Sequence, residues 1–222
     1  SAESALKSGA GIINIFSLSG NVQNILEKRP EYMVLSKVDD LKKFFEKKIT
    51  IIAGPGTTNY SRLNEILEII YNDETNLVLD AACIEIVKSK KFSSLPIITP
   101  HEGEAAKLLG INVDEISNKR EYYAQKISDK FSVITVLKGY ETIITDGNEI
   151  YICKDGDSSL AFAGSGDILA GLIGSFLAQG AKRIDSCLLG VSLHAYSATN
   201  SKLKRGLTAN ELIDLIRKNL NQ

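Results

Sequence analysis

The chain has 222 residues and a formal net charge of −1, with lysine, arginine, aspartate and glutamate scattered along its length. This balance argues against nucleic acid as the main partner, and no apolar run is long enough to predict a transmembrane helix, so we expect no membrane association. The length allows one large domain with a substantial core.

Short apolar, β-branched runs predict eight strands, at Gly11–Phe16, Tyr32–Leu35, Ile49–Ala53, Leu77–Asp80, Ile97–Thr99, Val133–Leu137, Thr142–Asp146 and Glu149–Cys153. Segments with helical periodicity alternate with them, at Ala2–Ser8, Val22–Arg29, Val38–Phe45, Tyr60–Tyr71, Ala82–Lys90, Glu102–Leu109, Lys119–Phe131, Gly166–Gln179, Ile184–Ser201 and Thr208–Asn219. This alternation predicts an α/β fold with a mostly parallel central sheet that helices cover on both faces.

Two features refine this outline. Asp146-Gly147-Asn148 lies between two alternating runs and predicts a late β-hairpin. No linker, repeat or low-complexity segment interrupts the sequence, so we expect one domain over residues 1–222. The sequence opens without methionine in a helix-like segment that runs straight into a strand, so we expect the natural protein to start upstream.

The three cysteines, Cys83, Cys153 and Cys187, are far apart and have neither metal-site spacing nor the even count of a disulfide framework. We expect them to be small buried apolar residues in a reducing cytoplasm. His101 and His194 are too few for a multi-histidine metal site.

The most informative motif is Ala163-Gly164-Ser165-Gly166-Asp167, which precedes the apolar helical run from Ile168. The first turn of a helix presents unpaired N–H groups and a positive dipole end, which attract phosphate, and glycines allow close approach. A carboxylate there suits a base that takes a proton from a hydroxyl attacking phosphorus. The alternative is an ordinary helix cap after a glycine turn.

Further polar motifs follow the predicted strands: Gly54-Pro55-Gly56, Asp80, Thr99-Pro100-His101-Glu102 and Lys138-Gly139. Because ligands of open α/β sheets bind beyond the carboxyl ends of the strands, four such motifs at one edge predict a crevice. Each motif also has a structural interpretation, as a tight turn, a helix cap, a solvated loop and a solvated lysine respectively.

In this order, the motifs resemble the ADP-dependent (S)-NAD(P)H-hydrate dehydratases of the ribokinase-like superfamily, from Ala5 to about Ser201. The segments that carry the resemblance are Ser8–Gly11, Pro30–Met33, Gly54–Gly56, Asp80-Ala81, Thr99–Gly110, Leu137–Gly139, Thr142, Gly164–Gly171 and Ala178–Gly180. The resemblance implies a three-layer sandwich whose first strand and glycine-rich loop have no counterpart before Ser1.

It also implies that ADP, or ATP, phosphorylates the ring hydroxyl of NADH or NADPH hydrate and that phosphate is then eliminated. By matching positions, Asp167 is the base, and the amides of Gly164, Ser165 and Gly166 stabilise the transferring phosphoryl group. The nucleotide contacts fall on Lys138, Gly139, Tyr140, Glu141, Thr142 and Gly166, and the substrate contacts on Gly54, Gly56, His101 and Asp167. Mg²⁺ offsets phosphate charge, with no protein ligand assigned.

The resemblance further implies a homo-oligomer and an epimerase domain fused upstream. The sequence departs from the family at four places: Thr57-Thr58, Ala82, Glu102 and Asp157–Ala163. These departures keep two alternatives open. One is a kinase for a vitamin precursor or sugar on the same fold, and the other is a nucleotide-binding relative without catalysis.

Overall fold

The computed structural model describes residues 1–16, 27, 29–44, 47–57 and 60–222. Its centre is a six-stranded sheet in the spatial order β3 (Thr50–Ala53), β4 (Asn76–Leu79), β5 (Ile97–Ile98), β6 (Ile134–Leu137), β7 (Thr142–Thr145) and β8 (Ile150–Cys153). Strands β3 to β6 are parallel, whereas β7 and β8 form the antiparallel hairpin predicted around Gly147.

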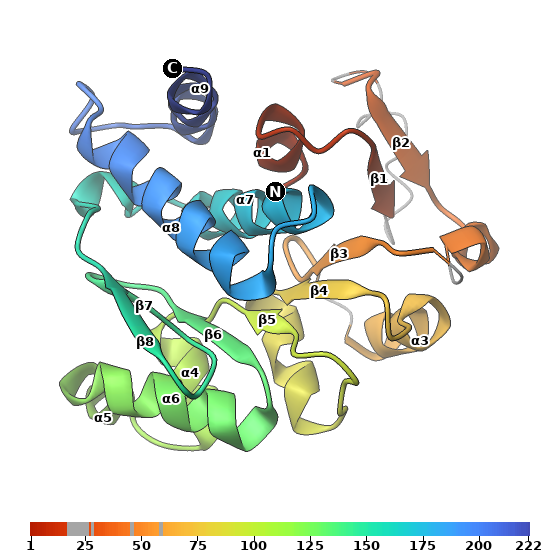
Figure 1. Ribbon diagram of the computed structural model, residues 1–222, viewed down its shortest axis with the longest axis horizontal. Helices are drawn as coiled ribbons and strands as arrows, with labels where there is room; N and C mark the ends of the chain where they lie inside the picture. Colours follow the sequence, from red (N-terminus) through yellow and green to blue (C-terminus); the bar gives the residue numbers. More distant parts are fainter. Residues whose placement is uncertain (17–26, 28, 45–46, 58–59) are drawn as a thin grey trace.

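Helices cover both faces of this sheet (Figure 1). Below it in that view lie α3 (Tyr60–Ile70), α4 (Glu102–Leu109), α5 (Val113–Asn118), α6 (Arg120–Phe131) and the 3₁₀ helix η2 (Ala81–Lys88). Above it lie α7 (Ser165–Ala178) and α8 (Arg183–Thr199), which α1 (Ala2–Lys7) and α9 (Ala209–Leu220) cover in turn.

Two apolar clusters, one on each face, hold the three layers together. Val78 and Ile97 pack against α7 and α8, whereas their chain neighbours Leu79 and Ile98 pack among the helices of the other face. Successive side chains of a strand point to opposite faces, so continuous apolar runs are what a doubly covered sheet requires. The predicted three-layer sandwich is therefore confirmed.

Helix α7 packs unusually close to its neighbours, as its glycines predict. A Cβ atom on Gly171 would lie 2.3 Å from the carbonyl oxygen of Ser1, and one on Gly174 would lie 2.5 Å from Ile52 Cδ1. The hydroxyl of Ser4 donates a hydrogen bond to the carbonyl of Ile168 at 2.7 Å. The start of α7 is thus fixed between α1 and the sheet.

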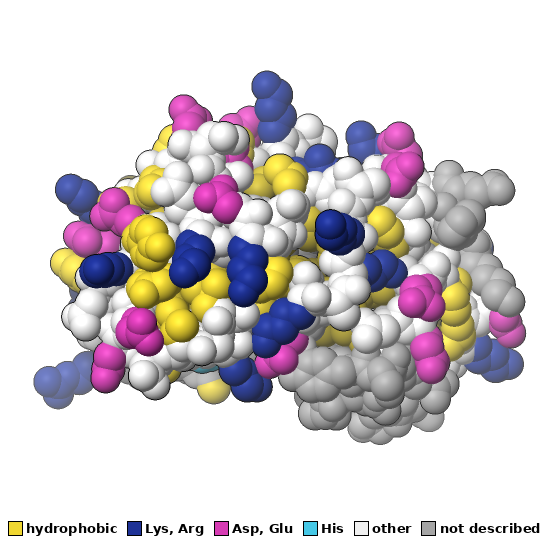
Figure 2. Space-filling view, turned by 90° about the horizontal axis from the view of Figure 1, so that it is seen from below, with side chains coloured by type: hydrophobic (Ala, Val, Ile, Leu, Met, Phe, Trp, Pro, Cys, Tyr) yellow, Lys and Arg dark blue, Asp and Glu magenta, His cyan; other side chains and the backbone are white. Residues whose placement is uncertain are grey.

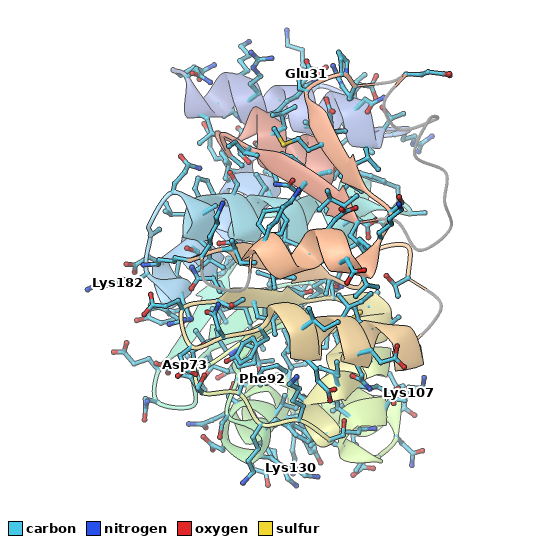
Figure 3. All side chains as sticks on the ribbon, turned by 90° about the vertical axis from the view of Figure 1, so that its right-hand side faces the viewer. Glu31, Asp73, Phe92, Lys107, Lys130 and Lys182 are labelled. Atoms are coloured by element: carbon cyan, nitrogen blue, oxygen red, sulfur yellow. The ribbon has the colours of Figure 1, made fainter. Side chains whose placement is uncertain are left out.

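Strands β1 (Ile13–Phe16) and β2 (Tyr32–Leu35) differ from the prediction, because they pair in parallel with each other in a separate two-stranded sheet. Their burial is incomplete: Tyr32 and Leu35 are buried, whereas Met33 is 55% exposed. Figure 3 shows this small sheet near Glu31, at the opposite end of the view from Lys130 on α6.

Several smaller elements also differ. The segments η1 (Val38–Phe44) and η2 are 3₁₀ helices, and α5 and η3 (Ser158–Leu160) were not predicted. The helix predicted at Val22–Arg29 lies, apart from Glu27 and Arg29, outside the described residues.

The surface carries both signs of charge. Figure 2 shows lysine, arginine, aspartate and glutamate side chains interspersed with hydrophobic and neutral ones over the face below the sheet. None of the helices in the described part of the chain combines the length and hydrophobicity needed to cross a lipid bilayer.

Candidate active site

The four predicted motifs meet at the carboxyl edge of β3 to β6. Gly54 follows β3, Asp80 follows β4, His101 comes shortly after β5, and Lys138 follows β6. His101 and Lys138 form a parallel β-bridge, and the Lys138 N–H donates to the carbonyl of Pro100 at 2.8 Å. The segments that follow β5 and β6 therefore lie side by side at this edge and pair through their backbones.

Gly54 allows the first two motifs to approach each other. Its φ is +128°, and a Cβ atom at this position would lie 1.7 Å from the carbonyl oxygen of Asp80. Any side chain would collide with backbone, so the position requires glycine. The turn is closed by the N–H of Thr57, which donates to the carbonyl of Gly54 at 2.9 Å.

Asp80 fixes the side chain of Lys138. Its carboxylate is 2% exposed, and Oδ1 accepts hydrogen bonds from Thr99 Oγ1 at 2.6 Å and from Lys138 Nζ at 2.8 Å. Asp80 precedes η2, yet its side chain caps no N–H of that helix. Its role in the fold is thus to anchor an ammonium group, with Glu104 Oε2 lying 3.8 Å away on the other side of Nζ.

Lys138 lies directly beside the start of α7. A Cβ atom on Gly166 would be 3.1 Å from Lys138 Nζ. Gly164 is the N-cap of α7 with a left-handed φ of +96°, and Asp167 lies in the first turn with its side chain partly exposed. An ammonium group and a positive helix end meet here at a glycine backbone, which is the composition of an anion-binding site.

A buried histidine on the neighbouring helix α8 contacts the first residue of α7. His194 Nε2 on α8 lies 3.3 Å from Ser165 Oγ, and both side chains are buried. Burial, assisted by the nearby charge of Lys138, lowers the pKa of His194 from 6.5 to about 4, although a hydrogen bond with the Ser165 backbone acts in the opposite direction. The imidazole is therefore neutral at neutral pH.

Sequence reasoning considered His194 only as a metal ligand and missed this role. The available signal was its place in the helix, four residues before the buried Ala198 and three after the buried Val191. That spacing turns the imidazole toward the protein interior.

His101 has a structural role that sequence reasoning did not assign. It is the N-cap of α4: Nδ1 accepts hydrogen bonds from the N–H groups of Gly103 and Glu104, and the Glu104 carboxylate accepts one from the His101 N–H at 2.8 Å. Because Nδ1 is an acceptor, the neutral ring carries its proton on Nε2. The side chain is 61% exposed, and Nε2 lies 3.6 Å from Glu104 Oε1.

The predicted nucleotide loop, Lys138 to Thr142, turns away from β6 and returns as β7. Tyr140 is 79% exposed, and Thr142 Oγ1 donates to the carbonyl of Gly139 at 3.2 Å. Arg120 of α6, a residue that sequence reasoning missed, donates to the carbonyls of Lys138, Tyr140 and Glu141 in this loop and of Leu137 just before it.

The segment Asp157–Ala163, where the sequence departs from the family pattern, contains one carboxylate, and its hydrogen bonds are formed within the protein. Asp157 accepts hydrogen bonds from the N–H and hydroxyl of Ser159 and from Lys204 Nζ at 2.9 Å. These partners, Ser159 first, hold the pKa of Asp157 at about 2. Leu160 and Phe162 pack against the cluster that contains Ile168, so the segment is anchored on α7.

The metal-ligand set of the chain is small. The described residues contain no group of three or more histidine, cysteine, aspartate or glutamate side chains that could enclose a metal ion. Mg²⁺ commonly uses one or two carboxylates together with substrate phosphates and water. Asp167 is partly exposed and fits that mode of binding, with the phosphates supplying the other ligands, whereas the Asp80 carboxylate is buried and bound to Lys138 and Thr99.

Comparison with known proteins agrees with this geometry. The sequence pattern of the NAD(P)H-hydrate dehydratase family matches residues 1–219. The bifunctional NAD(P)H-hydrate repair enzyme Nnr of Vibrio cholerae serotype O1 is 33% identical over 228 residues, covering 99% of this chain and 46% of that protein. The chain thus spans just under half the length of this curated relative.

Two solved structures are also similar. The ADP/ATP-dependent NAD(P)H-hydrate dehydratase of Bacillus subtilis, co-crystallized with ATP and Mg²⁺ and soaked with CoA, superposes with a TM-score of 0.87 at 25% identity, covering 98% of this chain and 83% of that one. A ribokinase-like superfamily protein of Enterococcus faecalis gives 0.87 at 22% identity, covering 99% and 80%, and so supports the fold alone. The fold is ribokinase-like, and the chain belongs to the NAD(P)H-hydrate dehydratase family.

Proposed function

We propose that this chain repairs hydrated nicotinamide nucleotides by dehydrating (S)-NADH or (S)-NADPH hydrate at the expense of ADP or ATP. The observation that carries the proposal is the position of Asp167. It lies in the first turn of α7, on the glycine-rich helix start that Lys138 adjoins, in a chain that matches this family over nearly its whole length.

The chemistry gives each group a task. Hydroxide is a poor leaving group, so the ring hydroxyl first takes the terminal phosphoryl group of ADP. AMP is the leaving group of this transfer. Loss of a proton from the neighbouring carbon then expels phosphate, forms the C=C bond and restores the reduced ring. The net change converts hydrate and ADP to NAD(P)H, AMP and phosphate.

We assign Asp167 to accept the hydroxyl proton, since a carboxylate on an anion site otherwise repels its ligand. We assign the amides of Gly164 and Gly166, together with Lys138, to stabilise charge on the phosphoryl group. The Ser165 amide, expected to share this role, donates to the Phe162 carbonyl at 3.3 Å in this structure. Gly139, Tyr140, Glu141 and Thr142 contact the nucleotide, and Gly54, Gly56 and His101 line the hydrate pocket. Mg²⁺, when bound with the nucleotide, offsets phosphate charge.

We also propose a cytoplasmic setting, a homo-oligomer and association with an epimerase activity. The three cysteines are free, which suits a reducing compartment.

Leu189 and Tyr196 expose apolar surface on α8 that a second copy could cover, and the Vibrio cholerae relative is named bifunctional. Light scattering of the purified protein tests the oligomer: a monomer at all concentrations contradicts it.

The role of Asp167 is tested by Asp167→Asn. We expect kcat to fall by about 10²- to 10⁴-fold, the usual contribution of a positioned general base, while ADP affinity is retained. Phosphate release and the near-ultraviolet absorbance of the reduced ring report turnover, and calorimetry reports binding.

Asp185→Asn is the matched control, because Asp185 lies in the first turn of the neighbouring helix α8 and its side chain is exposed. This control should keep full turnover. A fully active Asp167→Asn protein would contradict the assignment, and accumulation of a stable phosphorylated product by the wild-type protein would favour a kinase instead.

A further inference from the structure

Arg120, at the first position of α6, reaches across to the loop that follows β6. Figure 1 shows α6 beside β6 and β7. Arg120 Nη2 donates to the carbonyls of Leu137 and Lys138, each at 3.3 Å. Arg120 Nη1 donates to those of Tyr140 and Glu141, the latter at 3.0 Å. One guanidinium group therefore holds four of the five carbonyls between residues 137 and 141.

The four terminal N–H groups of Arg120 are all used by these carbonyls. The remaining nitrogen, Nε, lies 2.9 Å from Glu102 Oε1 in an ion pair, and the Arg120 side chain is only 16% exposed. A guanidinium group has five N–H donors in a fixed fork, so no terminal donor is left for a phosphate. The geometry thus argues against Arg120 as a direct phosphate ligand.

The loop conformation depends on this contact. A Cβ atom on Gly139, whose φ is +145°, would lie 2.6 Å from Arg120 Nη2, so only glycine lets the guanidinium group come this close. Glu141 has a left-handed φ of +56° without being glycine. Such a residue persists where its surroundings fix it, and here its carbonyl is held by Arg120.

Holding the carbonyls also orients the amides. In a trans peptide the N–H points opposite to the C=O. With the carbonyls of residues 138 and 140 on Arg120, the N–H groups of Gly139 and Glu141 point away from the guanidinium group. These two amides alternate along the loop, and N–H groups that point to the same side of a turn form an anion-binding concavity.

Glu102 completes the arrangement, at one of the places where the sequence departs from the pattern of the family it resembles. Glu102 Oε2 accepts a hydrogen bond from Ser117 Oγ at 2.6 Å, so the carboxylate is fixed from both sides. Since Glu102 is the first residue of α4, proline would be tolerated there, and the glutamate is not needed to start the helix.

We propose that Arg120 and Glu102 are positioning residues that preorganise the Lys138–Thr142 loop for the phosphates of a nucleoside di- or triphosphate. This inference rests on the proposed function only in taking the loop as the nucleotide site. A preordered loop does not have to be fixed when the ligand binds, so the arrangement contributes to nucleotide affinity.

Arg120→Lys and Glu102→Pro test the proposal. Lysine keeps the charge but cannot reach four carbonyls, and proline suits the first position of α4. We expect Kd and KM for ADP to rise about 10-fold, equivalent to roughly 1.4 kcal/mol, with kcat and KM for the hydrate changed less than about 2-fold. Arg183→Lys, at the first position of α8, is the matched control and should bind ADP normally.

Chemical rescue adds a result that lost stability alone does not produce. A groove of about 370 Å³ opens beside Arg120, lined partly by residues 117 to 122 and Glu141. In Arg120→Ala, low concentrations of guanidinium ion should restore ADP affinity, whereas sodium at equal ionic strength should not.

Both variants binding ADP as tightly as the wild-type protein, while folded, would overturn the proposal. So would a uniform change in kcat and both KM values, which indicates general damage. If ADP binding depends on Arg120 but no hydrate is dehydrated, this inference holds and the proposed function fails. If the wild-type protein binds neither ADP nor ATP, both fail.

Discussion

The residues behind the anion site are as informative as those that face it. Asp80 binds Lys138, and His194 contacts Ser165 within the protein, so two groups beside the glycine-rich start of α7 are held by buried polar partners. Preorganised donors stabilise developing charge without having to reorient during the reaction. The side chains of Lys138 and Ser165 are therefore held in position by buried residues behind the candidate site.

His194 makes stability depend on pH. Its folded-state pKa of about 4 lies below the unfolded value of 6.5, so the unfolded chain binds the proton more readily. The stabilisation is present above pH 6.5 and is lost as pH falls toward 4. Between about pH 7 and pH 5 we expect the free energy of unfolding to decrease by about 2 kcal/mol through this group.

Urea unfolding at several pH values measures this effect. His194→Gln should be less stable at pH 7 and should lose little further stability down to pH 5. An equally steep decrease in the wild-type protein and in His194→Gln would show that other groups cause the acid sensitivity.

At the scale of the elements, the backbones that follow β3 and β4 approach each other closely at Gly54 and Asp80. Gly54 and Gly56 both have positive φ, but only Gly54 faces the Asp80 backbone, whereas a Cβ atom on Gly56 would meet nothing within 4 Å. Gly54→Ala should therefore cost more than about 3 kcal/mol, and Gly56→Ala about 1 kcal/mol from its left-handed backbone alone. Thermal unfolding distinguishes them, and equal losses would contradict the close approach.

The regular elements were predictable to the extent that their signals are local. The eight strands of the described residues were all predicted, because apolar β-branched runs mark them, and α4 was predicted with its observed bounds. Helix α5 was missed because six residues are too few to show a period, although Asn112 and Glu115 form a capping box that could have marked its start. Whether a short helix is 3₁₀ or α, as in η1 and η2, is not encoded in its periodicity.

At the scale of the whole molecule, the layers followed from strand and helix alternation, but the separation of β1 and β2 did not. Their sequences are as apolar as those of β3 and β4, and only the strand pairing shows that they form a sheet of their own. Three-dimensional pairing across the chain is not a local property.

The candidate site shows the same limit. Gly54, Asp80, His101 and Lys138 were predicted because each comes at or soon after the end of a parallel strand, where the topology brings the ends together. Arg120 and His194 were missed, because their partners lie 17 to 21 and 29 residues away and depend on how α6 and α8 pack. The convergence of the strand-end motifs was predictable from the order of the strands, and the side-chain partners that hold Lys138–Thr142 and Ser165 were not.

The measurement that tests the proposed function most directly follows phosphate release and reduced-nicotinamide absorbance together, from ADP and Mg²⁺ with and without NADH hydrate. We expect phosphate release only with the hydrate, with one reduced nicotinamide formed for each phosphate. ADP binding without hydrate-dependent phosphate release, or phosphate release with no return of the absorbance, would contradict the proposed repair reaction.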